Sequence, residues 1–244
     1  YVVSNHQFMK DKFPIINTLK LRYSFGLVGN DQIESSGSEV RFPYLTTINT
    51  NATGYYFGDI PGYYYGVTDS KLGSTGLVWE KAKKHNWGID LTLLDEAVNI
   101  TVDAFLDKRD NIFMERRTLP GTIGVRSTIW GNVGIMKSWG TDGTASYTKK
   151  FGEVTLEARG NFTFTRDKIL DYDEVIPRYP YLAQKGNSYG ITRGLIALGL
   201  FKDEDDIKNS PQQFGKVLPG DIKYQDVNGD GVIDSYDIVP IGNA

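Results

Sequence analysis

The chain has 244 residues, a formal net charge of −3, 13% aromatic residues and no cysteine. The mild charge gives no electrostatic basis for binding nucleic acid, and the lack of cysteine excludes a disulfide framework and thiolate chemistry. No apolar run approaches the ~18 residues that a membrane-spanning helix needs. The length suits one sizeable domain or part of a larger one. Because the chain begins at Tyr1 rather than at a methionine, we expect an internal piece of a longer protein.

Residues 18–29 form the first predicted strand, after a short mixed segment at 8–13 that fits a helical turn or a loop. Apolar residues alternate here with Lys20 and Arg22. Successive side chains of a strand point to opposite faces, so this pattern predicts one apolar and one charged face. Charged groups in the middle of a strand need water or a partner. The apolar row is Leu19, Leu21, Tyr23, Phe25 and Leu27.

Residues 30–75 predict a long excursion, rich in Gly, Ser, Thr, Asn and aromatic side chains. Such long loops are usually functional or disordered, and so many aromatic residues argue for an ordered one. Two interpretations stay open: a surface that stacks on sugars or peptides, or rings that pack on one another or form an interfacial girdle. The candidate substrate-contacting residues are Tyr55, Tyr56, Tyr63, Tyr64 and Tyr65.

Residues 87–107 predict an antiparallel hairpin, because two alternating runs flank an acidic turn at 94–97. We expect its first strand to begin near 77–80 and its second to continue through 112–114. Phe105 interrupts the otherwise polar row. The hairpin alone favours a soluble sandwich or barrel with its apolar face inward. The alternative is a membrane barrel, whose apolar face meets lipid and whose polar face meets a wet lumen.

Two more strand regions follow. Residues 133–149 predict a weaker strand interrupted at 140–143, and residues 154–165 predict a clean strand after a tight turn at 150–153. Tight turns at 94–97 and 150–153, with long connections elsewhere, are typical of outer-membrane barrels. The strands also exceed the ~9–11 residues that are needed to cross a bilayer.

The other long connections are predicted at 119–130 and at 171–220, where the second contains several prolines. Within it, the acidic segment 203–208 favours a single helical turn.

Residues 226–237 carry the strongest local motif, with oxygen ligands at positions 1, 3, 5, 9 and 12 and a glycine at position 6. This spacing can wrap Ca²⁺, a hard cation that takes 6–8 oxygens. Position 12 is Asp237 rather than Glu, and Pro240 forbids a regular exiting helix, so the loop is not a helix–loop–helix sensor. We expect a structural Ca²⁺, and the alternative is an ion-free Asp/Gly turn. The expected ligands are Asp226, Asn228, Asp230, the carbonyl of Val232, Asp234 and Asp237.

Catalytic constellations are poor. The two histidines, His6 and His85, lie far in sequence from any Ser-rich elbow, and there is no phosphate-binding glycine loop. Asp90, Asp103 and Glu157 lie on polar strand faces and could act as an acid and base, as in glycosidases. Solvated or ion-paired lumen residues are far commoner, so we expect no enzyme.

Several short stretches of the chain matter through their identity, order and spacing. They are LKLRYSFG at 19–26 with GND at 29–31, WE at 79–80 with NWGID at 86–90, NFTF at 161–164 with KIL at 168–170, and PGDIKY at 219–224 leading to the loop at 226–237 and IGN at 241–243. Each is weak alone, but over nearly the whole chain the set resembles the SusC-like (RagA-like) TonB-dependent outer-membrane transporters.

The resemblance implies an all-β fold, in which residues 1–244 form an antiparallel meander from the middle-to-late part of a large transmembrane β-barrel of ~22 strands. It implies import of bulky nutrients across the outer membrane, chiefly oligosaccharides and sometimes peptides. The long extracellular loops would meet the substrate and a SusD-type surface lipoprotein, and the loop at 226–237 would stiffen one of them. TonB would act through an N-terminal part.

Two other classes stay open: a secreted carbohydrate-binding or dockerin-like calcium module, and an extracellular glycoside hydrolase of β architecture. Dockerins need two calcium loops flanked by helices, and this sequence has one such loop. The direction of the apolar rows discriminates, because a barrel turns them toward lipid and a soluble body buries them under a second layer. We also expect the outermost strands to pair with further barrel strands, since open edges are not tolerated in lipid. The rows in question are Leu19/Leu21/Tyr23, Ile89/Leu91/Leu93 and Val154/Leu156/Ala158.

Overall fold

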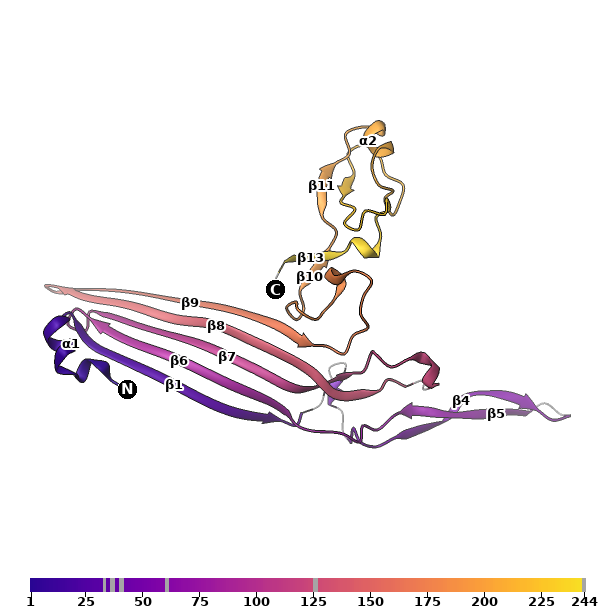
Figure 1. Cartoon of the computed structure of the whole chain (residues 1–244), viewed down its shortest axis with the longest axis horizontal. Helices are drawn as coiled ribbons and strands as arrows, with labels where there is room; N and C mark the ends of the chain where they lie inside the picture. Colours follow the sequence, from indigo (N-terminus) through magenta and orange to yellow (C-terminus); the bar gives the residue numbers. More distant parts are fainter. Residues whose placement is uncertain (33, 36–37, 40–41, 60–61, 125–126, 243–244) are drawn as a thin grey trace. The chain divides into compact units, whose positions relative to one another are not determined.

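A computed structural model describes residues 1–32, 34–35, 38–39, 42–59, 62–124 and 127–242 (Figure 1). The chain divides into two compact units, Tyr1–Asp173 and Glu174–Ala244. Residue 243, part of the IGN stretch, lies outside the described residues. No helix in the described part of the chain is long and apolar enough to cross a membrane.

The first unit is built around a five-stranded antiparallel sheet with the order β1-β6-β7-β8-β9 (Figure 1). The turns at 94–97 and 152–153 are short, whereas the connections at the opposite end of the sheet are long. This confirms the predicted antiparallel meander, and every strand is long enough to cross a bilayer. The strands are β1 (Ile16–Asn30), β6 (Glu80–Leu93), β7 (Val98–Glu115), β8 (Trp130–Phe151) and β9 (Val154–Asp171).

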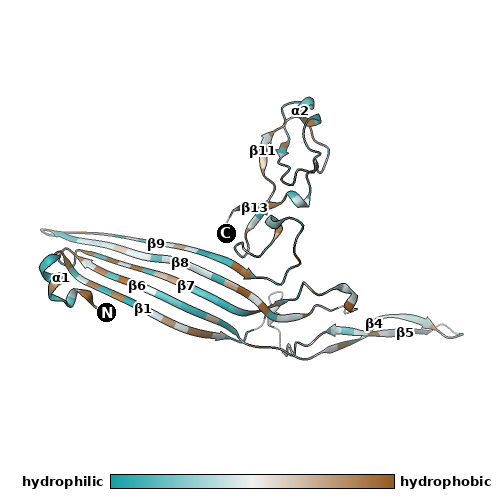
Figure 2. Ribbon diagram, in the orientation of Figure 1, coloured by the Kyte–Doolittle hydropathy of each residue, from teal (hydrophilic) through white to brown (hydrophobic). Residues whose placement is uncertain are grey.

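The register aligns the alternating residues of neighbouring strands into continuous rows. Leu21 pairs with Ile89 and Ile89 with Val102, whereas one position along, Arg22 pairs with Gly88. The row of Leu21, Ile89 and Val102 lies on one face, and the row that contains Arg22 and Asp103 lies on the other. Figure 2 shows brown and teal residues in turn along the strands. Leu21 is 43% exposed, Ile89 47% and Phe162 52%. The apolar face is therefore an open surface within this unit, as expected for a face that meets lipid.

The predicted interruption at 140–143 was wrong, because β8 runs through it without a break. A Cβ atom on Gly140 would lie 2.6 Å from Cζ of Phe105, and one on Gly143 would lie 2.5 Å from Cε1 of Phe162. The two glycines thus make room for aromatic rings of the neighbouring strands, a known use of glycine inside a sheet. The same contact explains Phe105, which interrupts the polar row because it covers Gly140.

The predicted excursion at 30–75 was also wrong in part, because it contains a second hairpin of β4 (Thr47–Phe57) and β5 (Gly62–Lys71). Its aromatic residues occupy consecutive positions and so fall on both faces, which is why no alternation was visible. Of the two interpretations of residues 8–13, a helical turn or a loop, the structure shows the helix, α1 (Gln7–Lys12). The unit also contains η1 (Val3–Asn5), β2 (Glu34–Ser35), β3 (Ser38–Glu39) and η2 (Gly121–Ile123).

The second unit consists of short elements around a small core that includes Phe201 and Ile233, which are 2% and 1% exposed. The predicted helical turn at 203–208 is confirmed as α2, and the side chain of Asp203 caps it by accepting from the N–H of Asp206. The strands pair as β10 with β13 and β11 with β12. The elements are η3 (Pro180–Leu182), β10 (Thr192–Gly194), β11 (Ala197–Leu200), α2 (Glu204–Lys208), β12 (Ile222–Tyr224), η4 (Ser235–Asp237) and β13 (Val239–Gly242).

Candidate functional site

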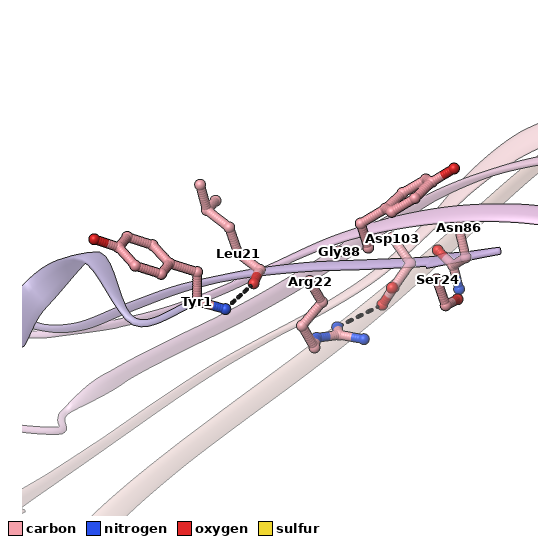
Figure 3. Close-up of a pocket in the computed structure, with 8 residues that line it drawn as sticks. Tyr1, Leu21, Arg22, Ser24, Asn86, Gly88 and Asp103 are labelled. Carbon is pink, nitrogen blue, oxygen red and sulfur yellow. Dashed lines mark hydrogen bonds and ion pairs between the residues drawn. The ribbon is translucent and has the colours of Figure 1, made fainter.

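The polar face of the main sheet holds a charged cluster centred on Arg22. Its Nε and Nη2 atoms each donate to the Asp90 carboxylate at 2.9 Å, and Nη2 also donates to Oδ2 of Asp103 at 3.0 Å. A Cβ atom on Gly88 would lie 2.6 Å from the guanidinium carbon of Arg22, so the absence of a side chain there lets the guanidinium reach both strands. Figure 3 shows the part of this cluster in which the guanidinium of Arg22 reaches Asp103.

This cluster fits an ion-paired wall better than an acid–base pair. Asp90 and Asp103 share one guanidinium, so both carboxylates serve as its hydrogen-bond acceptors. Glu157 lies on β9, opposite Thr148 of β8, and is not brought to them. The three acidic residues considered for glycoside hydrolysis therefore do not form one site.

Further ion pairs tie neighbouring strands together across the same face. The ammonium of Lys20 lies 3.7 Å from Asp90, that of Lys84 lies 3.7 Å from Asp107, and Arg109 lies 3.5 Å from Glu80. Such a face suits the water-filled or protein-filled interior of a barrel, where charges remain hydrated or paired.

The five candidate tyrosines come together on the β4–β5 hairpin but divide between its two faces. Tyr55 pairs with Tyr64 in register, and Tyr56 pairs with Tyr63. The rings of Tyr56 and Tyr63 lie 5.1 Å apart, those of Tyr63 and Tyr65 lie 5.2 Å apart, and the hydroxyl of Tyr63 accepts from the N–H of Gly54. Tyr55 and Tyr64 lie on the opposite face and are 70% and 62% exposed. Both faces carry ring contacts, because Phe57 lies 5.3 Å from Tyr55 and 6.1 Å from Tyr64. The pair Tyr55 and Tyr64 is nevertheless more exposed than the pair Tyr56 and Tyr63, which are 61% and 43% exposed.

Two acidic residues that the sequence analysis did not single out hold the long connections in place. Asp69 of β5 accepts hydrogen bonds from the hydroxyl and the N–H of Ser127, which hold the pKa of Asp69 below its ordinary value. Both contacts join segments more than fifty residues apart, so no local pattern could have indicated them.

Asp173 is the second such residue. It accepts from Nε of Arg116 at 2.7 Å, from the N–H of Arg117 at 3.2 Å and from the hydroxyl of Thr118 at 2.8 Å. Partial burial alone would raise the pKa of Asp173, but the hydrogen bonds from Thr118 and Arg116 outweigh it, and the net pKa is lowered. Asp173 therefore holds residues 116–118, which follow β7, against the end of β9.

The loop at 226–237 is held together by hydrogen bonds from its own backbone N–H groups to its Asp side chains. The Asp226 carboxylate accepts from the N–H groups of Gly229 at 2.6 Å and Gly231 at 2.8 Å. Asp237 is fully buried and accepts from Val227 at 2.7 Å and from Asp234 at 2.9 Å. Across the residues that the structure describes, no three Asp, Glu, His or Cys side chains are grouped to hold a metal ion.

Calcium binding at this loop therefore stays a prediction. Each carboxylate oxygen has two lone pairs, so a backbone hydrogen bond leaves one for a cation, and the oxygen-only donor set is of the kind that Ca²⁺ prefers. The loop follows β12, ends in the short η4 and is followed by β13, an arrangement unlike the pair of helix-flanked loops of a dockerin.

Comparisons with known proteins agree with this geometry. Residues 18–239 match the family described as "TonB dependent receptor-like, beta-barrel". The chain is 28% identical to TonB-dependent receptor P39 and 24% identical to TonB-dependent receptor P3, both of Formosa agariphila. Each match covers 99% of this chain, but 25% and 24% of those relatives.

Similar solved structures are those of the RagAB peptide importer in its open-open state, with a TM-score of 0.61 and 19% identity, and in its closed-closed state, with a TM-score of 0.59 and 20% identity. Both matches cover 96% of this chain and 24% of that chain, so the chain spans about a quarter of the length of the relatives it matches. The exposed apolar face, the paired charges on the other face and the match over residues 18–239 lead to one conclusion. The chain belongs to the β-barrel family of the TonB-dependent receptors, which reside in the outer membrane and are transporters rather than enzymes.

Proposed function

We propose that this chain forms part of the barrel wall of a TonB-dependent importer for a bulky nutrient, an oligosaccharide or a peptide. The observation that carries the proposal is the main sheet, whose apolar face is open and whose opposite face is lined by ion pairs such as Arg22–Asp90. A wall of this kind separates lipid from a wet interior large enough for a bulky substrate. The edge strands β1 and β9 would pair with further strands of the same barrel.

The long connections lie at the end of the sheet opposite the short turns, which is the extracellular end of an outer-membrane barrel. By its resemblance to SusC-like proteins, the importer would work with a SusD-type surface lipoprotein at this end, and TonB would drive it from the periplasm. The similarity to the RagAB peptide importer supports a peptide substrate. The exposed rings of the β4–β5 hairpin suit either a peptide or a sugar, since both stack on aromatic faces.

Uptake by cells carrying the full-length protein tests this proposal. We expect cells without the protein, or without a functional TonB, to lose uptake of a labelled oligosaccharide mixture or a labelled peptide mixture. A tagged full-length protein should also co-purify with a surface lipoprotein. Unchanged uptake of both mixtures in both strains would contradict the proposal.

The hairpin offers a matched pair of variants for the same assay. Replacing Tyr55 and Tyr64 by serine removes the more exposed pair of rings. We expect the uptake KM to rise about thirtyfold, because two aromatic contacts of about 1 kcal/mol each are lost. Replacing Tyr56 and Tyr63 removes the rings that pack on each other, so we expect it to increase proteolysis of the hairpin rather than to change KM selectively. If the two variants have the same effect, neither face contacts substrate specifically.

A further inference from the structure

A row of lysines crosses four neighbouring strands on the apolar face of the main sheet. Lys83 of β6 pairs in register with Lys108 of β7, which pairs with Lys137 of β8, which pairs with Lys168 of β9. These four residues, the lysine row, lie an even number of positions from Ile89, Val102 and Phe162, so they share the face of the apolar rows.

The height of the lysine row places it at the edge of the membrane. From Leu93, beside the short turn, to Lys83 the strand advances ten residues, or ~33 Å at ~3.3 Å per residue. With a strand tilt of ~40°, this is a rise of ~25 Å, which is the height of the apolar band of an outer-membrane barrel. The row is at the end with the long connections, so it faces the headgroups of the extracellular leaflet.

Aromatic side chains lie directly below the row. Two residues nearer the membrane centre, the register joins Phe25, His85 and Trp139 through Leu106. The ammonium of Lys137 lies 5.4 Å from the centre of the Trp139 ring. On β9, Arg166 occupies the register position of the aromatic row and lies 4.9 Å from the centre of the Phe164 ring. Rings at the interface with cations beyond them are how a membrane-facing surface meets headgroups.

The lysine row places four positive charges at neighbouring register positions of the sheet. Strands lie ~4.8 Å apart, and like charges directly opposite each other on a sheet are destabilising. Asp110 lies 3.5 Å from the ammonium of Lys83 and 2.9 Å from that of Lys108, which offsets part of this repulsion on one side of the row. Lys83 and Lys108 are still about half exposed, at 51% and 44% of their side chains. An external anion with several oxygen atoms would stabilise the row further.

We propose that the lysine row binds phosphate groups of a phosphorylated lipid in the extracellular leaflet, with the acyl chains of that lipid against the apolar rows below. The lipid is favoured over a soluble anion because the cations continue the membrane-facing surface at the depth of the headgroups. The inference rests on the orientation of the sheet in the outer membrane and does not depend on the nutrient that is imported.

The test uses full-length protein in a neutral detergent and measures its unfolding midpoint by the shift of the folded band on a gel. The probe is diphosphoryl lipid A, compared with enzymatically dephosphorylated lipid A and with inorganic phosphate. We expect diphosphoryl lipid A to raise the midpoint of the unsubstituted protein by several degrees. The variant K83Q/K108Q/K137Q/K168Q should lose at least half of that rise.

Two controls separate position from charge. The variant K149Q/K150Q/K202Q/K216Q removes the same charge at exposed lysines outside the row, and it should keep the full rise. Arginine at all four row positions should also keep the full rise of the midpoint. If the fourfold glutamine variant does not fold, the double variant K137Q/K168Q replaces it. The proposal is overturned if diphosphoryl lipid A does not stabilise the unsubstituted protein, if the row variant keeps the whole rise, or if dephosphorylated lipid A or inorganic phosphate gives the same row-dependent rise. Uptake of nutrient is a separate readout, so failure here leaves the proposed function standing.

Discussion

Asp173 shows how a single carboxylate organises the end of the sheet that carries the long connections. Its side chain is only 13% exposed and accepts from Arg116, Arg117 and Thr118. Asp173 has a φ of 48°, a left-handed conformation that asparagine also tolerates, so Asp173→Asn removes the charge without straining the backbone. Hydrogen bonds to a charged group contribute about 1.5–3 kcal/mol, and we expect local opening of residues 116–119 to become easier by about that amount. Hydrogen exchange of this segment measures it, with Asp59→Asn as the control.

The same residue predicts a pH dependence. Because the folded-state pKa of Asp173 is lowered, its contribution is fully present above its ordinary pKa of about 3.9 and is lost as the pH falls through the folded value. Exchange protection of residues 116–119 should therefore fall below about pH 4 in the unsubstituted protein, after correction for the intrinsic exchange rate. Asp173→Asn should lack this acid step, and an equal step in both proteins would contradict the assignment.

Asp237 separates the structural role of the loop at 226–237 from its predicted metal binding. The residue is fully buried, and Asp237→Ala leaves the N–H groups of Val227 and Asp234 without their acceptor. Each unsatisfied group costs about 1–3 kcal/mol, so the loop should open at least tenfold more often by hydrogen exchange.

A second, independent prediction for the same loop concerns calcium binding. If Ca²⁺ binds there, adding it to chelator-treated full-length protein slows exchange at 226–237, and replacing Asp226 and Asp230 by asparagine removes that response. Asp205→Asn, on α2 and 85% exposed, should leave the response intact. Equal exchange with Ca²⁺ and with chelator would identify the loop as an ion-free turn.

The strands themselves show which parts of the fold were predictable. Strict alternation around Leu21 and Ile89 predicted β1, β6 and β7, because that pattern depends only on local geometry. The turn after Leu93 was predictable for the same reason. The partners of Arg22, by contrast, depend on the register between β1 and β6. The hydrogen bond from Arg116 to Asp173 joins residues that are 57 positions apart in the sequence. No single strand carries that information.

Gly140 lies where the predicted interruption of the strand was wrong, and a substitution there tests how tightly β8 packs against β9. A Cβ atom there would lie 2.2 Å from the carbonyl oxygen of Phe164, which is backbone, so Gly140→Ala forces β8 and β9 to shift. Overpacking of this kind costs about 1–3 kcal/mol. Gly160 on β9 has nothing within 4 Å of its Cβ position, so Gly160→Ala should be neutral or slightly stabilising. Unfolding of the full-length protein in detergent compares the two, and similar effects would mean that Gly140 is not crowded.

At the scale of the whole molecule, two adjacent residues of β9 decide which face meets lipid. Phe162 shares a row with Ile89 and Leu21, about midway between the short turn and the lysine row, whereas Asn161 lies on the charged face beside it. An arginine on the lipid side near the bilayer centre costs about 2–4 kcal/mol, but a lumen-facing arginine stays in water. We therefore expect Phe162→Arg to reduce the amount of folded protein recovered from the outer membrane, and Asn161→Arg to change it little.

The comparison is sharp because the two variants add the same side chain to the same strand at nearly the same depth. Unfolding free energies of the full-length protein in lipid vesicles should differ between them by about 2 kcal/mol or more, with Phe162→Arg the less stable. The same pair in a detergent micelle, which deforms around a charge, should differ less. If Asn161→Arg proved as damaging as Phe162→Arg in vesicles, both faces of the sheet would be packed against protein, and the sheet could not be the boundary between lipid and an open interior.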